Sequence, residues 1–383
     1  MNIKETRKAD PRVDTRYISS LNIKGYGERN LYPQELRAIV FASPNARGCY
    51  ERRANYIEGD GLASAALSET VCNKRGEKLD DIHALCAADL ALYEGVALHF
   101  NYTIEGKISS VTHIPFENCR LEEADENGIV HHIVVHPDWS EKLTRKGKPI
   151  KVNEDNVTRY NVFNPDPIVV QREIEAVGGI ANYRGQVLYK TTEGLNTYCT
   201  PRVDASLTDI STDEGISNVN YRNVRYNFLA GGLMWVKRSA GNEANEEALT
   251  QAIEDLQGDT HACKIAVCFG ETDEDKPELI PFAGENQDGK YVNTTGTVVS
   301  NIYAAFNQDL FYRLRTGSIG FSGELAETVR LEYCEQLTKE QRFLSRIYKQ
   351  FLSYWQEGVM PYRGYEDVQI VPLVKSVTTN GVL

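Results

Sequence analysis

Apolar residues are unusually sparse in the helical stretch that begins at Val203. Between Asp204 and Tyr226, acidic and amide side chains separate the few apolar positions, which are Leu207, Ile210, Ile216, Val219 and Val224. A stripe this narrow cannot be held by burial in the core of a single chain. We therefore expect this helix to stand beside copies of itself or to line a water-filled space.

The first two hundred residues alternate between helical and strand periodicity, which is typical of one mixed α+β domain. The pattern predicts helices over 33–42, 44–58, 79–94 and 166–177, and strands over 96–102, 108–114, 128–135, 157–163 and 186–190. Turn residues at 105–106 join the first two of these strands in a hairpin.

Two helix ends carry recognisable signals. Ser43 and Pro44 are an N-cap and a first helical residue, which predicts that a helix starts there. The 79–94 helix has apolar residues on one face, including Leu85, and Gly95 is the expected C-terminal stop.

The second half follows a different order of elements. After the polar helix we expect strands at 233–236, 264–269, 278–282 and 368–374, and helices at 242–256, 291–306 and 324–356. The segment 307–323 contains three glycines around Arg313 and Arg315. No run of 18 or more apolar residues is present, so no membrane-spanning segment is predicted.

Charge is distributed unevenly over the 383 residues. The formal net charge is −12, and residues 239–285 hold 12 acidic residues against two lysines. This block is either a solvated acidic face or a surface that attracts a basic partner and repels DNA phosphates. No basic stripe or recognition helix is evident, so sequence-specific DNA binding is not expected.

Motifs for catalysis or metal binding are not apparent. The eight cysteines show no CxxC spacing, which is typical of reduced, buried thiols in a protein made in a cytoplasm. The histidines at 131, 132 and 136 and the group His261, Cys263 and Cys268 alternate across strand faces, so neither is expected to be a zinc site. No P-loop, GxSxG or HExxH motif occurs, and we predict neither enzymatic activity nor a cofactor.

Several local motifs, taken in their order along almost the whole chain, support a family resemblance. They are Ser43-Pro44-Asn45, the run Arg52–Ile57 with Gly59–Leu62, the run Leu92–Leu98, the run Ile114–Glu117, and Asn227–Lys237. In this order the chain resembles the portal proteins of tailed bacteriophages, particularly the compact type found with HK97-like heads.

The resemblance implies an α+β, portal-type fold. Its expected parts are a mixed α/β wing domain (1–202, with an N-terminal arm), stem helix 1 (203–229), a small αβ clip (230–289), stem helix 2 (290–306), a tunnel loop (307–323), and a long wing helix with a C-terminal strand (324–383). Many portals continue into a helical crown. In this chain the crown is expected to be minimal or absent.

The resemblance also implies a function. Portals form rings, usually of twelve subunits, at one capsid vertex, through which DNA is packaged and ejected. The implied partners are other copies of the chain, the terminase large subunit, the head–tail connector or adaptor, the major capsid protein, and double-stranded DNA that passes without sequence specificity. The implied location is the virion, after assembly in the host cytoplasm.

Three groups of residues are the expected functional positions. The tunnel loop would present Arg313, Arg315, Ser318 and Phe321 to DNA, and the stem would line the channel with Asp204, Asp209 and Asp213. Glu243, Glu246, Glu247, Glu254 and Asp255 would form the docking surface of the clip. An acidic channel would repel the DNA phosphates weakly, so that DNA slides through it. For Arg313 and Arg315, a role in surface salt bridges is as good an explanation as contact with DNA.

Two other interpretations remain open. The chain could be another phage structural protein, such as a capsid or connector subunit, or a cytosolic α+β enzyme. A ring with a through-channel would favour the portal, whereas a monomer or dimer with a deep closed pocket would favour the enzyme.

Overall fold

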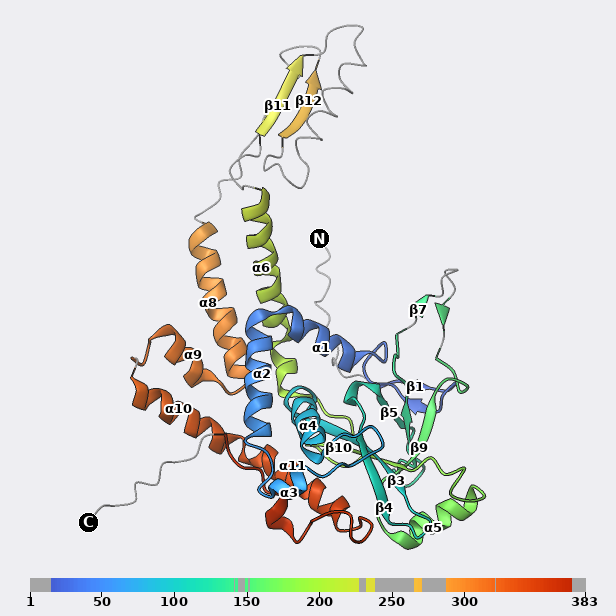
Figure 1. Ribbon diagram of the computed structural model, residues 1–383. Helices are drawn as coiled ribbons and strands as arrows, with labels where there is room; N and C mark the ends of the chain where they lie inside the picture. Colours follow the sequence, from blue (N-terminus) through green and yellow to red (C-terminus); the bar gives the residue numbers. More distant parts are fainter. Residues whose placement is uncertain are drawn as a thin grey trace, which may run out of the picture. The chain divides into compact units, whose positions relative to one another are not determined.

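The computed structural model describes residues 15–140, 142–143, 149–150, 152–226, 232–237, 265–270, 287–320 and 322–373 (Figure 1). The chain divides into two compact units. Unit 1 comprises residues 1–208 and 300–383, and unit 2 comprises residues 209–299. Unit 2 is therefore inserted into the sequence of unit 1. None of the described helices is long and apolar enough to cross a membrane.

Unit 1 is built on an eight-stranded mixed sheet with the strand order β1-β2-β5-β6-β9-β10-β3-β4. The strands are β1 (Tyr17–Ile18), β2 (Ile23–Lys24), β3 (Gly95–Tyr102), β4 (Ile108–His113), β5 (Cys119–Glu122), β6 (His132–Val135), β9 (Thr158–Val162) and β10 (Gln186–Thr191). Only β9 and β10 pair in parallel in this sheet, and the predicted β3–β4 hairpin is confirmed. The short strands β7 (Lys142–Leu143) and β8 (Pro149–Ile150) pair with each other.

The helices of unit 1 are α1 (Tyr32–Ala42), α2 (Pro44–Glu58), α3 (Ala65–Ser68), α4 (Leu79–Tyr93), α5 (Pro167–Ala176), α9 (Asp309–Thr316), α10 (Gly323–Gln336) and α11 (Thr338–Leu352), with 3₁₀ turns η1 (Phe116–Asn118), η2 (Arg202–Ser206) and η4 (Tyr365–Val368). Side chains of α2, α3, α4, α5, α10 and α11 form the main core together with those of β3, β4 and β10. Leu90 of α4, Phe100 of β3 and Phe351 of α11 are fully buried together in this core. Ser43 caps α2 as predicted, because its Oγ accepts from the Ala46 amide at 3.1 Å.

The end of α4 differs from the prediction. Glu94, and not Gly95, takes the left-handed conformation at φ 54°, while Gly95 begins β3. A Cβ at Gly95 would lie 2.4 Å from Cε2 of Phe116, so the close approach of that ring explains the glycine. On the helix itself Leu85, which was predicted to lie on the apolar face, is 42% exposed, and His83 is fully buried.

The C-terminal half of unit 1 also differs from the prediction. The segment expected to be a loop contains the helix α9, because its first glycine, Gly317, is the left-handed cap of that helix. The expected long helix is broken at Leu337 into α10 and α11. The last predicted strand, 368–374, is described as far as residue 373. There the chain forms the end of η4 and one isolated β-bridge, between Leu62 and Ile370, instead of a strand.

Unit 2 contains most of two helices and a parallel pair of strands. They are α6 (Leu207–Tyr226), α8 (Gln287–Ala305), β11 (Gly232–Lys237) and β12 (Ile265–Gly270). The polar helix, its following strand, the 264–269 strand and the 291–306 helix are thus confirmed. The helix expected at 242–256 and the strand expected at 278–282 lie outside the described residues.

Candidate functional site: paired arginines at the roots of α6 and α8

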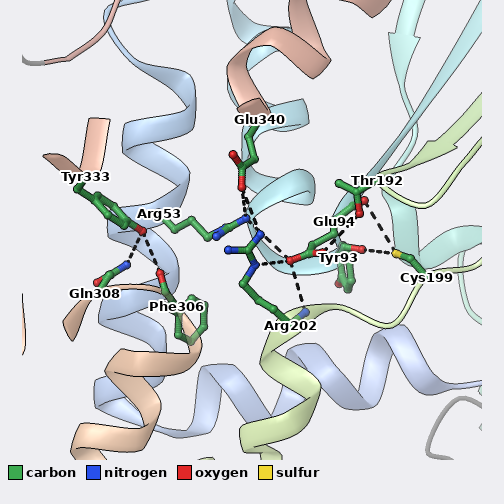
Figure 2. Close-up of polar contacts among 10 residues, drawn as sticks. All are labelled: Arg53, Tyr93, Glu94, Thr192, Cys199, Arg202, Phe306, Gln308, Tyr333 and Glu340. Carbon is green, nitrogen blue, oxygen red and sulfur yellow. Dashed lines mark hydrogen bonds and ion pairs between the residues drawn. The ribbon is translucent and has the colours of Figure 1, made fainter. Parts of the chain in front are cut away.

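Arg53 of α2 is the centre of a buried cluster of four charged side chains (Figure 2). Its Nη2 donates to Oε1 of Glu340 at 2.9 Å and lies 4.0 Å from Oε1 of Glu94. Arg202 completes the cluster, since its Nε donates to Oε1 of Glu94 at 2.5 Å and its Nη2 to Oε1 of Glu340 at 3.3 Å. We call Arg53, Glu94, Arg202 and Glu340 the Arg53 cluster.

The Arg53 cluster balances two positive charges against two negative ones in the protein interior. Arg53 is only 1% exposed. Burial and then the neighbouring Arg202 lower the pKa of Arg53, while Glu340 and Glu94 act in the opposite direction. Such a group is tolerated only while its partners stay in place, because an unpaired buried charge is costly. The cluster therefore fixes α2, α11, the end of α4 and η2 relative to one another.

Glu94 reaches Arg202 because of its unusual backbone. The left-handed turn at Glu94 ends α4 and its backbone carbonyl accepts from the Thr192 amide at 2.9 Å. On the preceding residue, the carbonyl of Tyr93 accepts from Sγ of Cys199 at 3.0 Å (Figure 2). The chain that leads into η2 is thus tied to the end of α4 by backbone as well as by charge.

A second buried cluster surrounds Gln308, just after α8. Its Nε2 donates to the Cys49 carbonyl and to the Tyr333 hydroxyl, each at 2.8 Å, and its Oε1 accepts from Nη1 of Arg52 at 2.7 Å. The Tyr333 hydroxyl in turn donates to the Phe306 carbonyl at 3.4 Å (Figure 2). Burial raises the pKa of Tyr333 to about 12, so the phenol stays protonated and keeps this role.

The two clusters share one helix. Arg52 and Arg53 are neighbours on α2, and each reaches a different segment of unit 1 at which the chain passes to or from unit 2. Arg53 holds residue 202, shortly before the chain leaves unit 1, and Arg52 holds Gln308, shortly after it returns. The residues of the clusters are buried or half-buried, and each bonds to at least one other, so the arrangement is suited to fixing two chain segments in place. Nε and Nη1 of Arg53 and Oε2 of Glu340 have no hydrogen-bond partner within the described part of the chain.

The tunnel-loop residues lie on and just after α9. Arg313 is 55% exposed and pairs with Asp309 at 3.5 Å, whereas Arg315 donates from Nη1 to Oδ1 of Asn45 at 3.1 Å and to the Tyr303 hydroxyl at 3.0 Å. Ser318 donates to the Arg313 carbonyl at 3.2 Å. The two arginines therefore have protein partners, and Phe321 lies outside the described residues.

The three stem aspartates differ in their surroundings. Asp204 lies in η2, before the helix proper, and accepts from the Tyr32 hydroxyl at 2.8 Å. Asp209 is half-buried on α6, and Asp213 is buried at 5% exposure. Their assignment to a channel wall stays a prediction. The clip acids Glu243, Glu246, Glu247, Glu254 and Asp255 lie outside the described residues.

The histidines of β6 and its neighbourhood pair with carboxylates. His131 lies 2.9 Å from Oδ2 of Asp125, and His132 lies 2.6 Å from Oε2 of Glu122. Among the described residues, no three His, Cys, Asp or Glu side chains are grouped so that they could hold a metal ion.

The Arg53 cluster was not predicted, although part of its signal is in the sequence. Arg53 lies four residues after Cys49 and four before Ile57, so it occupies the buried stripe of α2. A charge at such a position requires a buried partner. The partners, at 94, 202 and 340, are too far away in sequence to be found from spacing.

Comparisons with known proteins gave matches only among solved structures. No protein-family model matches the chain, and no curated protein matches it. The chain is similar to one from the neck of a native gene transfer agent particle computed with C12 symmetry, with 12% identity, coverage of 86% of this chain and 81% of that one, and a TM-score of 0.45.

Two further structures are similar in the same way. A chain from the virion of a native gene transfer agent particle has 12% identity, coverage of 84% of this chain and 81% of that one, and a TM-score of 0.42. An HK97 family phage portal protein from Corynebacterium diphtheriae has 10% identity, coverage of 70% and 75%, and a TM-score of 0.32. A phage portal protein, the class that the sequence motifs resemble, is thus among the similar structures.

Proposed function

We propose that this chain is a phage portal subunit, which forms a ring at one capsid vertex and surrounds a channel for DNA. The observation that carries the proposal is the exposure of α6. Between Ser211 and Asn218, Asp213 is the only residue whose side chain is buried. Further along the helix, Tyr221 is 58% exposed. A helix of 20 residues with so few apolar contacts in its own chain needs other neighbours.

A closed ring supplies these neighbours. In a cyclic assembly every copy of α6 would have the same two neighbours. Its polar side chains could hydrogen-bond to those neighbours or face water. A ring also explains why the chain tolerates a long helix that is weakly amphipathic. Without such packing a helix with so narrow an apolar stripe would be only marginally stable in water.

The two buried clusters would let the subunit withstand the force that passing DNA exerts on the channel wall. A channel wall that carries passing DNA must transmit force to the body of each subunit. Arg52 and Arg53 fix the segments on either side of unit 2 to one rigid helix, so a load on either segment is shared by the core of unit 1. Buried, charge-assisted contacts suit such a joint because they are directional.

The finer assignments belong to the same proposal. DNA would pass the channel without sequence-specific contacts, with Asp204, Asp209 and Asp213 along the stem and Arg313, Arg315, Ser318 and Phe321 at the constriction. The terminase large subunit or the head–tail connector would dock on the acidic clip residues, and the major capsid protein would hold the ring in the vertex. Reversal of Glu243, Glu246 and Glu247 to Lys should weaken terminase binding most at low salt, whereas an unchanged affinity would remove that assignment.

The decisive experiment is the mass of the purified protein by native mass spectrometry, combined with class-averaged electron micrographs. We expect a ring of about twelve copies with a central hole, as cyclic closure of identical contacts requires a fixed number of subunits. A compact monomer or dimer in which α6 is covered by its own chain would overturn the proposal.

A further inference from the structure

One side of α11 carries four cations in helical register. Lys339, Arg342, Arg346 and Lys349 are spaced at i, i+3, i+7 and i+10, and all four are exposed. The opposite side of the helix is buried through residues such as Leu344, Ile347 and Phe351. None of the four cations forms an ion pair with another described residue. We call this set the α11 basic stripe, a feature that the sequence analysis did not identify.

The surroundings of the stripe add positive charge and aromatic surface. Nζ of Lys190, on β10, lies 5.4 Å from the ring centre of Phe343, and Nζ of Lys349 lies at the same distance from the ring of Tyr365. Burial and then the nearby Arg346 lower the pKa of Lys190. Like charges held so close together repel one another, so this surface favours an acidic partner.

The preceding helix carries the opposite charge. Glu324, Glu327, Glu332 and Glu335 are exposed on one side of α10, whose buried residues are Val329, Tyr333 and Cys334. None of these four carboxylates is ion-paired within the part of the chain that the structure describes. We call them the α10 acidic stripe.

The two stripes match in size as well as in sign. At 1.5 Å per residue, the acidic stripe is about 16 Å long and the basic stripe about 15 Å, with four charges on each. They lie on consecutive helices separated by the break at Leu337 (Figure 1), and no ion pair joins one stripe to the other among the described residues. A second copy of the chain would offer each stripe a surface of opposite charge and similar length.

We propose that the α11 basic stripe of one copy docks on the α10 acidic stripe of the next. This inference rests on the proposed ring and assigns the surfaces that close it. The contact is heterologous, because it joins two different surfaces, and so each added copy leaves one stripe of each sign free until the ring closes. Binding of DNA would occupy the basic stripe alone and leave the acidic stripe unpartnered, so a second copy fits both observations better.

A charge-reversal series tests the proposal in the full-length protein. Glu327→Lys with Glu335→Lys brings the net charge of the α10 stripe from −4 to zero, and Arg342→Glu with Arg346→Glu brings that of the α11 stripe from +4 to zero. At low salt each double variant should lower the ratio of ring to free subunit at least about tenfold, because the net attraction between the two stripes is then lost. The variant in which all four glutamates become Lys and all four cations become Glu restores opposite charges with the signs exchanged, and it should recover rings in native mass spectra.

A matched control reverses exposed charges outside both stripes. Lys74 and Arg172 form no ion pair within the described residues, and Lys74→Glu with Arg172→Glu should leave the ring fraction unchanged. Thermal unfolding of every variant separates loss of the contact from loss of the fold.

The outcomes distinguish this inference from the proposed function. Wild-type rings that persist in both double variants would overturn the stripe contact but leave the portal proposal standing. A monomeric wild-type protein would overturn both. Intact rings with weaker DNA binding in the α11 variant would show that the basic stripe contacts nucleic acid instead, and would likewise overturn the contact.

Discussion

At the scale of single residues, buried polar groups determine how unit 1 is held together. Arg53 and Glu340 are almost completely buried, and they are stable there only as partners. His83 is fully buried as well, between the Tyr348 hydroxyl and the Glu58 carbonyl. Each of these side chains bonds to a different segment of the chain. Substitution of Arg53 and of His83 should therefore change the stability of the protein in separate, measurable ways.

Removal of Arg53 should be costly. Arg53→Ala leaves Glu340 without one of its cations inside the protein, and we expect a loss of about 3–5 kcal/mol in the free energy of unfolding. Urea denaturation followed by circular dichroism measures this loss. The control is Arg47→Ala on the same helix, whose pair with Glu51 is exposed and should contribute less than about 1 kcal/mol. Equal effects of the two variants would contradict the role of the Arg53 cluster.

His83 should make stability depend on pH. A carbonyl only accepts, so Nε2 donates to Glu58 at 2.8 Å and Nδ1 accepts from Tyr348 at 2.9 Å, which fixes the neutral ring. Burial lowers the pKa of His83 below its ordinary value of 6.5. The unfolded chain therefore binds the extra proton first, and this stabilising contribution, complete above pH 6.5, is lost as the pH falls from 6.5 toward the lower folded pKa.

The slope of this loss is at most about 1.4 kcal/mol per pH unit for one group. Urea titrations between pH 7 and 5 should show a shallower slope in His83→Gln than in the wild type. His131→Gln, at an exposed position, is the comparison. An identical slope in His83→Gln and the wild type would mean that another group is responsible.

At the scale of elements, local signals set where most helices begin, while packing decides where several of them end. Ser43 caps α2 and Asp166 caps α5, both through a side chain that accepts from the first turn. The end of α4 is different, because the ring of Phe116 requires a glycine at 95 and so moves the left-handed cap to Glu94. The break at Leu337 similarly accompanies Tyr333 bonding to Gln308 and Glu340 bonding to Arg53.

Two glycine substitutions test this account. Gly95→Ala puts a methyl group against Phe116 and should destabilise the protein by about 1–3 kcal/mol, as other overpacked sites do. Gly48→Ala, in the interior of α2 with open space around it, should stabilise the protein by up to about 1 kcal/mol. Thermal melts of the two variants, measured side by side, should shift in opposite directions. A shared direction would contradict the packing explanation.

At the scale of the whole molecule, the proposed channel depends on groups that face DNA without holding the subunit together. Arg313 fits this description better than Arg315. Within the described residues its side chain forms one ion pair, with exposed Asp309, whereas Arg315 bonds to Asn45 and Tyr303. The two arginines can therefore be separated experimentally.

Arg313→Ala should leave ring mass and melting temperature unchanged but lower DNA packaging or retention, as measured by nuclease-protected DNA in assembled particles. The effect of Arg315→Ala is expected to include a lower melting temperature, since two hydrogen bonds are lost. Wild-type packaging in the double variant would end the assignment of these residues to the DNA path.

Sequence alone determined the local features of this protein. Hydrophobic periodicity and caps placed α1, α2, α5 and the β3–β4 hairpin close to their observed bounds, because those signals act between residues a few positions apart. The polar character of α6 and the portal resemblance were also evident from sequence.

Only the tertiary structure decided which distant residues meet. The partners of Arg53, the burial of His83 and the exposure of Leu85 on α4, and the helix within the 307–323 segment all depend on how elements pack. Side-chain pairing across hundreds of residues leaves no periodic trace in the sequence. The spacing of the stripes on α10 and α11 is present in the sequence, but only the folded chain shows that these charges are exposed and form no ion pair among the described residues.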